Sequence, residues 1–442
     1  MYGIMIRMLC FVHNVVYYRR FVVKDIENIP HRGVPTFVIA NHQNGMMDAM
    51  AILHTLYHDW RQPVFIARGD IFKKDSVARV LRFLKILPVF RKRDGGRDDI
   101  EKDIDIFRQA SKVLCNGGTL VIFPEAGHQQ GHYMNTFKKG FSRIAFMAEE
   151  MSDFKLGVRI LPMNIHYTDY FEFRSDLLVT CGEPFTFEEF FQQYKESPNQ
   201  AYISLNEKAR ARVKSMTPDI DIPEHYKEIE TITRMTSEHI LLRKGDSIHD
   251  LPAQKDAMME TIAAVKGLRD SDKLAFERLM GDTKEYMQLA EKLKVEDWAV
   301  NREVSAARLA AWMASAVVCS PFALFGFLNN LVPSTIIGQV NARIEDPMMH
   351  STFRYALGTA VAVPLWYVLV LLFVWLVSRS LVAVFVYLSV AAVCGLFFPS
   401  YRRNFWKLVS VVRMRMSGQK PGFKRLSALK SEIFSIVEPL LF

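Results

Sequence analysis

Three long apolar stretches in the second half of the chain restrict its fold more than any other feature. Residues 309–328, 355–377 and 381–398 contain no charged side chain. Segments of about 18 residues or more with this composition are candidates for membrane-spanning helices. These stretches raise the hydrophobic share of the whole chain to 50%, which argues against a simple soluble enzyme. The first stretch is interrupted by Pro321 and Gly326.

The charge distribution limits how these stretches can cross a membrane. The net charge is +9, and residues 400–442 carry nine Lys or Arg side chains against two acidic ones. Three crossings would place this basic segment and the first half of the chain on opposite sides, whereas the positive-inside rule favours the same side. We therefore expect two full spans, with 309–328 either dipping into the bilayer through a break at Pro321 or packing at its surface. The basic segment indicates anionic lipid headgroups as its partner, and not nucleic acid.

The first half of the chain alternates short apolar runs with helical periodicity. Helices are expected at 98–115 and 139–151. Apolar runs bounded by Pro or Gly predict strands at 36–40, 64–67, 87–90, 119–123, 159–165 and 177–180. This alternation predicts an α/β layer around a largely buried sheet.

Composition divides the chain into five segments. We expect an amphipathic membrane-associated helix at 1–22, an α/β domain at 23–190, a helical appendage at 191–305, a membrane segment at 306–400 and a basic cytosolic tail at 401–442. For the first segment, the alternative is a helix packed on the following domain. The five cysteines are scattered and form no CxxC, which indicates reduced packing residues in a cytosol-facing protein.

The most informative motif is FVIANHQNGMMD at residues 37–48. A predicted strand runs directly into Asn41 and His42, and Asp48 follows six positions after the histidine. A carboxylate can hold an imidazole in one tautomer, so that the other ring nitrogen takes a proton from an attacking hydroxyl. The pair alone is a weak signal, because most histidines are ordinary core or surface residues.

Three further stretches contain predicted apolar strands. The first two are followed by residues that could bind a ligand, and the third carries a proline. LPVFRKR at 87–93 ends in Arg91 and two more cations, which suit a phosphate or, alternatively, form a solvated strand end. GGTLVIFPEAGH at 117–128 ends in a Gly-containing turn of the kind at which α/β folds place ligand groups. RILPMNIHY at 159–167 taken alone indicates a core strand, and it carries Pro162.

Together, the four motifs resemble the PlsC-type glycerolipid acyltransferases, which comprise lysophosphatidate and glycerol-3-phosphate acyltransferases. The order NH…D, PVFR, FPE-x-G and LPM resembles the blocks of this family across residues 23–190. The apolar stretches beyond them resemble the branch of this family that has C-terminal membrane spans. The resemblance implies an α/β fold with a mixed sheet flanked by helices, followed by a helical appendage and C-terminal transmembrane helices.

The resemblance also implies roles for individual residues. His42 is the expected general base, Asp48 orients it, and Arg91 binds the acceptor phosphate. The expected substrate-binding residues are Asn41, Gln43, Arg91, Glu125, Ala126, Gly127, Lys138 and Pro162. The implied reaction is direct transfer from acyl-CoA or acyl-carrier protein, without a metal, another cofactor or an acyl-enzyme.

Two features depart from the pattern of this family. Five residues separate His42 from Asp48 instead of four. On a helix, one added residue rotates the aspartate by about 100°, so a loop or bulge around Gly45 is needed for the pair to meet. The arginine that usually follows the third block is also missing. His128 and Gln129 stand near its place, and we expect a lysine at 138 or 139 to contact the phosphate instead.

The sequence therefore predicts a membrane-bound O-acyltransferase of phospholipid synthesis, with its catalytic domain facing the cytosol. The acceptor is glycerol-3-phosphate or 1-acylglycerol-3-phosphate, and the product is lysophosphatidate or phosphatidate. The expected partners are this acceptor, an acyl thioester and membrane lipids. The missing arginine motivates a different lipid acceptor, such as a lyso-aminolipid, as an alternative. The lengthened His–Asp spacing motivates a catalytically inactive lipid-binding membrane protein.

Overall fold

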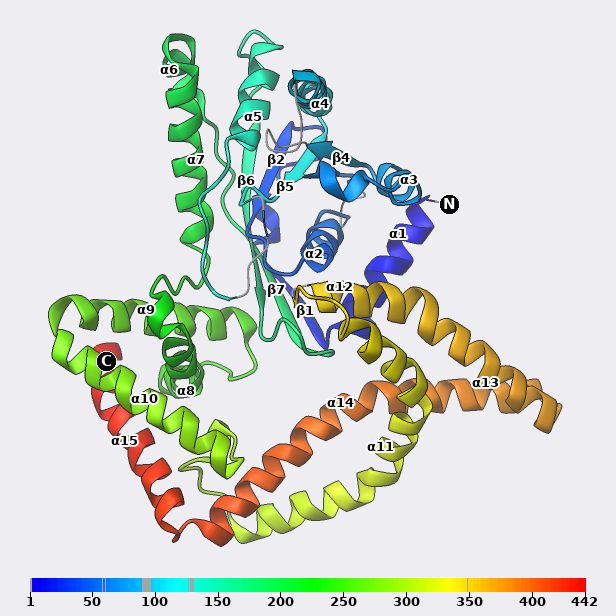
Figure 1. Ribbon diagram of the computed structural model, residues 1–442, viewed down its shortest axis with the longest axis vertical. Coiled ribbons are helices and arrows are strands. Elements are labelled where there is room, and N and C mark those ends of the chain that lie inside the picture. Colours follow the sequence, from blue (N-terminus) through cyan, green and yellow to red (C-terminus); the bar gives the residue numbers. More distant parts are fainter. Residues whose placement is uncertain are drawn as a thin grey trace. The chain divides into compact units, whose positions relative to one another are not determined.

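The computed structural model describes residues 2–57, 59, 61–89, 97–125, 127, 131–347 and 349–442. The chain forms two compact units, Met1–Thr217 and Pro218–Phe442. Figure 1 labels their helices and strands. The first unit is built around a β-sheet, whereas the described residues of the second unit form helices and no strand.

Seven strands form one sheet in the first unit. In chain order they are β1 (Arg20–Lys24), β2 (Thr36–Ala40), β3 (Val64–Arg68), β4 (Ile86–Val89), β5 (Thr119–Ile122), β6 (Arg159–Tyr167) and β7 (Asp176–Cys181). Their order across the sheet is β1-β7-β6-β2-β5-β3-β4. Neighbouring strands pair in parallel except β6 and β7, which are antiparallel. The predicted mixed α/β sheet is confirmed.

Apolar side chains from the central strands and from three helices build the core of the first unit. The helices are α4 (Arg97–Cys115), α5 (Gly140–Glu150) and α7 (Pro198–Lys214). Phe37 of β2 packs in this core with Phe141 of α5 and Leu205 of α7, and all three are inaccessible to solvent. Burying apolar surface stabilises a fold by roughly 25 cal/mol per Å², so this core fixes the strands whose ends carry the motifs.

The sequence patterns locate six of the seven strands. The predicted strand at 36–40 coincides with β2, and the other five overlap β3 to β7. The patterns do not predict β1, because Arg20 and Lys24 at its ends leave an apolar run of three residues. β1 pairs with β7, so the sheet begins before residue 23, where the α/β domain was expected to start.

The N-terminal helix α1 (Tyr2–Phe11) is apolar on two faces. Ile6 and Cys10 are buried, and α1 contacts α2 (Met46–Tyr57) of the same unit. Ile4 and Met8, on the other face, are 75% and 61% exposed. The helix therefore packs on the α/β domain through one face and presents the other at the surface.

The first unit extends beyond residue 190, where the α/β domain was expected to end. α6 (Phe191–Glu196) and α7 follow, and α7 belongs to the sheet core. The buried side chains of α7 in that core recur every four residues, at Ala201, Leu205, Ala209 and Val213. This spacing places them on one face of the helix, so α7 covers the core of the sheet.

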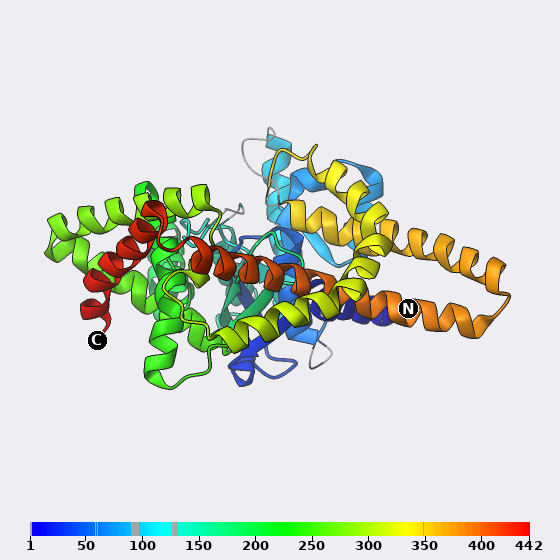
Figure 2. The ribbon, with the colours of Figure 1, turned by 90° about the horizontal axis from the view of Figure 1, so that it is seen from below.

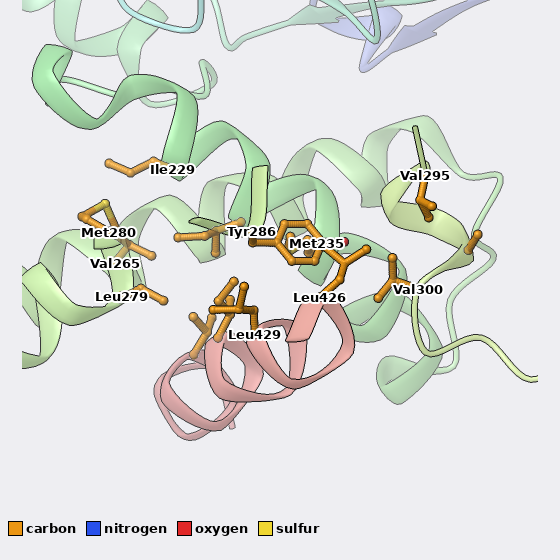
Figure 3. Close-up of a cluster of buried hydrophobic side chains, with 14 of the residues drawn as sticks. Ile229, Met235, Val265, Leu279, Met280, Tyr286, Val295, Val300, Leu426 and Leu429 are labelled. Atoms are coloured by element: carbon orange, nitrogen blue, oxygen red, sulfur yellow. The ribbon is translucent and has the colours of Figure 1, made fainter. Parts of the chain in front are cut away.

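The two ends of the second unit together form a helical bundle. α8 (Tyr226–Lys244), α9 (Leu251–Ser271), α10 (Lys273–Leu293) and α15 (Pro421–Leu441) share one core. Figure 3 shows Leu426 and Leu429 of α15 pointing into the cluster that Met235 and Tyr286 also line. Residues 421–441 of the segment 401–442, expected as a basic tail, therefore form a helix that closes the bundle.

Three helices of the second unit are long and apolar enough to cross a membrane. They are α11 (Ala306–Asn341), the helix Met349–Ser378 and α14 (Leu381–Ser417). The middle one consists of α12 (Met349–Phe353), π-helical turns over Arg354–Ala362 and α13 (Val363–Ser378). No more than 11% of the most apolar part of each is buried. Such exposed apolar surface indicates that the protein associates with a membrane.

We expect Leu205→Ala to destabilise the first unit by about 2–5 kcal/mol, because it leaves a cavity in the sheet core. Urea unfolding of the full chain in detergent, read by proteolysis within the first unit, measures this change. The matched control is Ile104→Ala in α4, where the side chain is 45% exposed, and we expect a change within about 0.5 kcal/mol. Equal effects of the two variants would show that α7 does not belong to this core.

Candidate active site

The loop between β2 and α2 brings His42 and Asp48 together. His42 follows β2 by two residues, and Asp48 lies in the first turn of α2. Gly45 between them has a φ of 53°, in the left-handed region that favours glycine. This turn absorbs the added residue, and His42 Nδ1 lies 2.8 Å from Asp48 Oδ2.

The Asp48 carboxylate is fully buried and accepts four hydrogen bonds. Oδ2 accepts them from His42 Nδ1 and from the backbone N–H groups of Gln43 and Asn44, at 2.7–2.8 Å. Oδ1 accepts the fourth from the Tyr167 hydroxyl, at 2.6 Å. These donors offset the cost of burying a charge and fix the carboxylate in one position.

The contact with Asp48 sets the tautomer of His42. A carboxylate oxygen accepts the Nδ1–H, so Nε2 is the nitrogen that can take up a proton. The His42 side chain is 18% exposed, and its ring stacks on Phe123 with 4.3 Å between the ring centroids. A partly exposed, oriented imidazole is the arrangement that general-base catalysis requires.

Two other histidines of this unit lack that exposure. His13 and His132 are buried, and burial lowers the pKa of each to about 4. Both are therefore neutral near pH 7. His132 lies 3.2 Å from the Tyr170 hydroxyl through Nδ1, so it belongs to a buried polar cluster. Of the three, His42 has the geometry of a catalytic base.

Glu125 lies just after β5 and contacts the backbone of the loop between β2 and α2, at His42. Its Oε1 accepts a hydrogen bond from the His42 N–H at 3.1 Å, and its Oε2 accepts one from the Asn135 N–H at 2.9 Å. Burial raises the pKa of Glu125 to about 7, although these two hydrogen bonds favour its ionised form. The carboxyl group therefore changes its charge near neutral pH while it accepts a hydrogen bond from the loop between β2 and α2.

Arg210 of α7 holds the loop that carries Asn135. Its Nε donates to the Asn135 carbonyl at 2.9 Å, and its Nη2 donates to the Met134 carbonyl at 3.0 Å. A guanidinium that bridges two carbonyls fixes their spacing. A chain of contacts thus runs from α7 through this loop and Glu125 to His42.

Asn41, Gln43 and Pro162 lie in or beside this site as supporting residues. The Asn41 amide bridges β2 to β6, since Ile165 donates to Asn41 Oδ1 and accepts from Asn41 Nδ2. Gln43 donates to the Gly131 carbonyl and accepts from the Tyr170 hydroxyl. Pro162 pairs with residue 39 of β2 and is buried in the sheet.

The remaining predicted site residues lie at the loop after β5 or outside the described residues. Gly127 is in that loop, and the Lys138 N–H donates to the Pro124 carbonyl, which places the exposed Lys138 next to it. Arg91 and Ala126 lie outside the described residues. Within the described ranges, no group of three or more His, Cys, Asp or Glu side chains could hold a metal ion.

Residues 20–166 match the protein-family model described as Acyltransferase. This segment includes the His42–Asp48 pair and is an acyltransferase domain. The predicted enzyme class, an acyltransferase, is confirmed.

The structure is also similar to the crystal structure of a 1-acyl-sn-glycerophosphate (LPA) acyltransferase, PlsC, from Thermotoga maritima. The two sequences are 21% identical, and the match covers 48% of this chain and 80% of that chain, with a TM-score of 0.33. In the comparison with curated proteins, no sequence matches this chain.

Tyr167 and Arg210 are site residues that the sequence patterns do not reveal. Tyr167 ends β6, at a position that strand alternation assigns to a core side chain. Arg210 lies in α7, beyond the four motifs, and reaches the site through contacts between residues far apart in the chain. Neither position carries a local sequence signal for its contact.

We expect Tyr167→Phe to lower kcat by roughly 10- to 100-fold with little change in KM, because hydrogen bonds to charged groups contribute about 1.5–3 kcal/mol. Tyr167 acts as a positioning residue through Asp48, and burial raises its pKa, so its hydroxyl stays protonated and donates. The matched control is Tyr286→Phe in the second unit, which loses a similar bond to Asp297. Initial-rate kinetics should give the control wild-type values. A variant of Tyr167 with wild-type kcat would remove it from the site.

Glu125→Gln tests the role of the buried carboxyl group in stability. The pKa of Glu125 in the folded chain, about 7, lies above its ordinary value of 4.5, so the protonated form stabilises the fold. This contribution is complete below about pH 4.5 and is lost as the pH rises through 7. We therefore expect the stability advantage of the wild type over Glu125→Gln to shrink between pH 5 and pH 8, by roughly 3 kcal/mol at most.

Thermal unfolding of both proteins across this pH range provides the measurement. Glu207→Gln, which changes an exposed side chain of α7, should follow the pH dependence of the wild type. A constant difference between wild type and Glu125→Gln would show that Glu125 does not titrate in this range.

Proposed function

We propose that this protein is a membrane-associated O-acyltransferase that moves a fatty acyl group from a thioester to a hydroxyl group of a glycerol phosphate. The donor is acyl-CoA or acyl-carrier protein, and the acceptor is glycerol-3-phosphate or 1-acylglycerol-3-phosphate. The observation that carries this proposal is the contact series from Tyr167 through Asp48 to His42, within and beside a domain of the acyltransferase family.

The proposed reaction uses the side chains of this series. Asp48 holds the Nδ1–H of His42, and Nε2 takes the proton from the acceptor hydroxyl. The hydroxyl oxygen attacks the thioester carbonyl carbon, a C–O bond forms, and the C–S bond breaks. The leaving thiolate takes the proton from His42, which restores the neutral imidazole for the next turnover. Transfer is direct, so no acyl-enzyme forms.

The acceptor phosphate requires cations near the histidine. Lys138 lies in the loop after β5, and Arg91 follows the edge strand β4, which pairs in parallel with its one neighbour, β3. The carboxyl ends of parallel strands meet at one edge of a sheet. We therefore propose that Arg91 and Lys138 bind the phosphate, with Gly127 and Ala126 lining the same site.

Three helices that are long and apolar enough to cross a membrane support a lipid substrate, because a membrane-bound enzyme meets its substrates at the lipid surface. The alternative acceptor is a lysolipid without a phosphate monoester, such as a lyso-aminolipid. The observation that favours it is the sequence around His128, where the family's usual arginine is missing. The same assay separates these acceptors.

The experiment is acyl transfer by membranes that contain the full chain. Labelled acyl-CoA and acyl-carrier protein are supplied with glycerol-3-phosphate, 1-acylglycerol-3-phosphate or a lyso-aminolipid. We expect transfer to one phosphate acceptor, and a loss of about 10²–10⁴-fold in His42→Ala, because general bases contribute rate factors of this size. The matched control is His31→Ala, which changes an exposed histidine of the same unit and should retain activity.

Three outcomes would contradict the proposal. Transfer to the lyso-aminolipid with none to the phosphate acceptors would assign the alternative substrate. Transfer that His42→Ala leaves unchanged would remove His42 as the base. Folded protein without any transfer would favour a lipid-binding role instead.

A further inference from the structure

Both ends of the apolar segment enter the same helical core. Leu309, near the start of α11, and Leu408 and Val411, near the end of α14, pack in the cluster that α8, α10 and α15 build. α15 follows α14 and contributes buried side chains along its length. The chain therefore leaves this core at α11 and returns to it at α14.

This return restricts the number of membrane crossings. A chain that starts and ends in one water-facing core crosses a bilayer an even number of times. Three apolar helices are long enough to cross, so at least one of them does not span. The contacts among the three identify which one.

α11 runs antiparallel to α14 as far as Asn329. The Tyr401 hydroxyl donates to the Ala316 carbonyl, and the Tyr387 hydroxyl donates to Asn329 Oδ1. A later residue of α11 thus contacts an earlier residue of α14, as expected for antiparallel helices. Tyr387 is eight residues after Arg379, which lies with Ser380 in the turn between α13 and α14. The antiparallel contacts of α11 with α14 therefore end about 12 Å short of that turn, at 1.5 Å per residue.

Beyond Asn329, α11 turns away from the turn that joins α13 to α14, which is called the hairpin tip here. The Asn329 carbonyl accepts a hydrogen bond from Trp366 Nε1, whereas Ile337 lies against Gly358. α13 runs toward Arg379, so residue 358 is farther from the tip than residue 366. Figures 1 and 2 show the same course, with the hairpin of α13 and α14 extending past α11.

Pro333 explains the turn in α11. A proline has no N–H for the carbonyl four residues earlier and kinks the helix, and here that carbonyl belongs to Asn329. Trp366 of α13 donates to it instead, at 2.6 Å. Pro321 likewise leaves the Val317 carbonyl without its helical donor, and the Ser320 hydroxyl donates to it at 2.8 Å. The carbonyls freed by Pro333 and Pro321 each accept a side-chain hydrogen bond. Both prolines are thus compatible with a hydrocarbon environment, where an unpaired carbonyl is costly.

We infer that α13 and the first half of α14 form a two-helix hairpin across the bilayer, and that α11 enters and leaves the bilayer on one side. The partner of this surface is the lipid hydrocarbon. The apolar part of α14, residues 381–398, spans about 27 Å at 1.5 Å per residue, close to the thickness of the hydrocarbon core, about 30 Å. This topology does not depend on the proposed acceptor or donor.

The topology also assigns sides. No helix among the described residues from 18 to 305 is long and apolar enough to span, so the acyltransferase domain, the bundle and α15 share one side. The helix ends at that side carry Arg354, Arg402 and Arg403, whereas the hairpin tip carries Arg379. The positive-inside rule makes the side of the bundle cytosolic.

Cysteine labelling with a membrane-impermeant reagent tests this topology in the full chain. The five native cysteines are replaced by alanine, and single cysteines are introduced as Ser215→Cys, Glu345→Cys, Ser378→Cys and Ser435→Cys. These positions report on the first unit, the end of α11, the hairpin tip and α15, and all are exposed. In sealed vesicles, we expect Ser378→Cys to react from one side and the other three from the opposite side. All four should react in detergent.

Two results would overturn the inference. Reaction of Glu345→Cys or Ser435→Cys from the side opposite to Ser215→Cys would show that an odd number of crossings separates that position from the first unit. Reaction of Ser378→Cys from the same side as Ser215→Cys would show that the hairpin does not span. If the alanine replacements prevent folding, protease protection of an epitope inserted after Glu345, and of another at Ser378, gives the same readings in the native background.

Discussion

The buried carboxylate of Asp48 is the constraint on which the active site depends. A charge in this position is tolerated only with several donors, and they come from the β2–α2 loop and from β6. The left-handed Gly45 lets the loop fold back on the first turn of α2. The register of β6 against β2 then places Tyr167 at the second carboxylate oxygen. The orientation of His42 thus results from the pairing of strands that are distant in sequence.

A second buried carboxyl group, that of Glu125, joins the loop between β2 and α2 to a helix outside the motif region. Arg210 of α7 supports the Asn135 loop, and this loop and Glu125 together reach the His42 backbone. α7 also fills the core of the sheet through Leu205. The same helix therefore stabilises the domain and supports the site. The functional unit is larger than the part of the chain that carries recognisable motifs.

Local patterns in the sequence predict much of this fold, because strands and amphipathic helices leave periodic signals. β2 is predicted to the residue, whereas β1 is missed because charged residues flank a run of three apolar ones. The His42–Asp48 pair is predicted from its motif, but the Tyr167 and Arg210 contacts link distant residues and leave no local pattern. α15 was expected as part of a basic tail, although its buried residues recur at three- and four-residue spacing. The basic composition of residues 401–442 indicates their charge but not the packing of α15 in the bundle.

The position of α15 in the bundle has a consequence for biogenesis. α8, α9 and α10 are synthesised before the apolar helices, whereas α15 is synthesised after them. The bundle therefore holds an open apolar face while α11, α13 and α14 emerge and meet the membrane. Closure by α15 must follow synthesis of these helices, because α15 lies after them in the chain and its buried face packs on α10. Until α15 emerges, the chain retains an exposed apolar surface that chaperones can recognise.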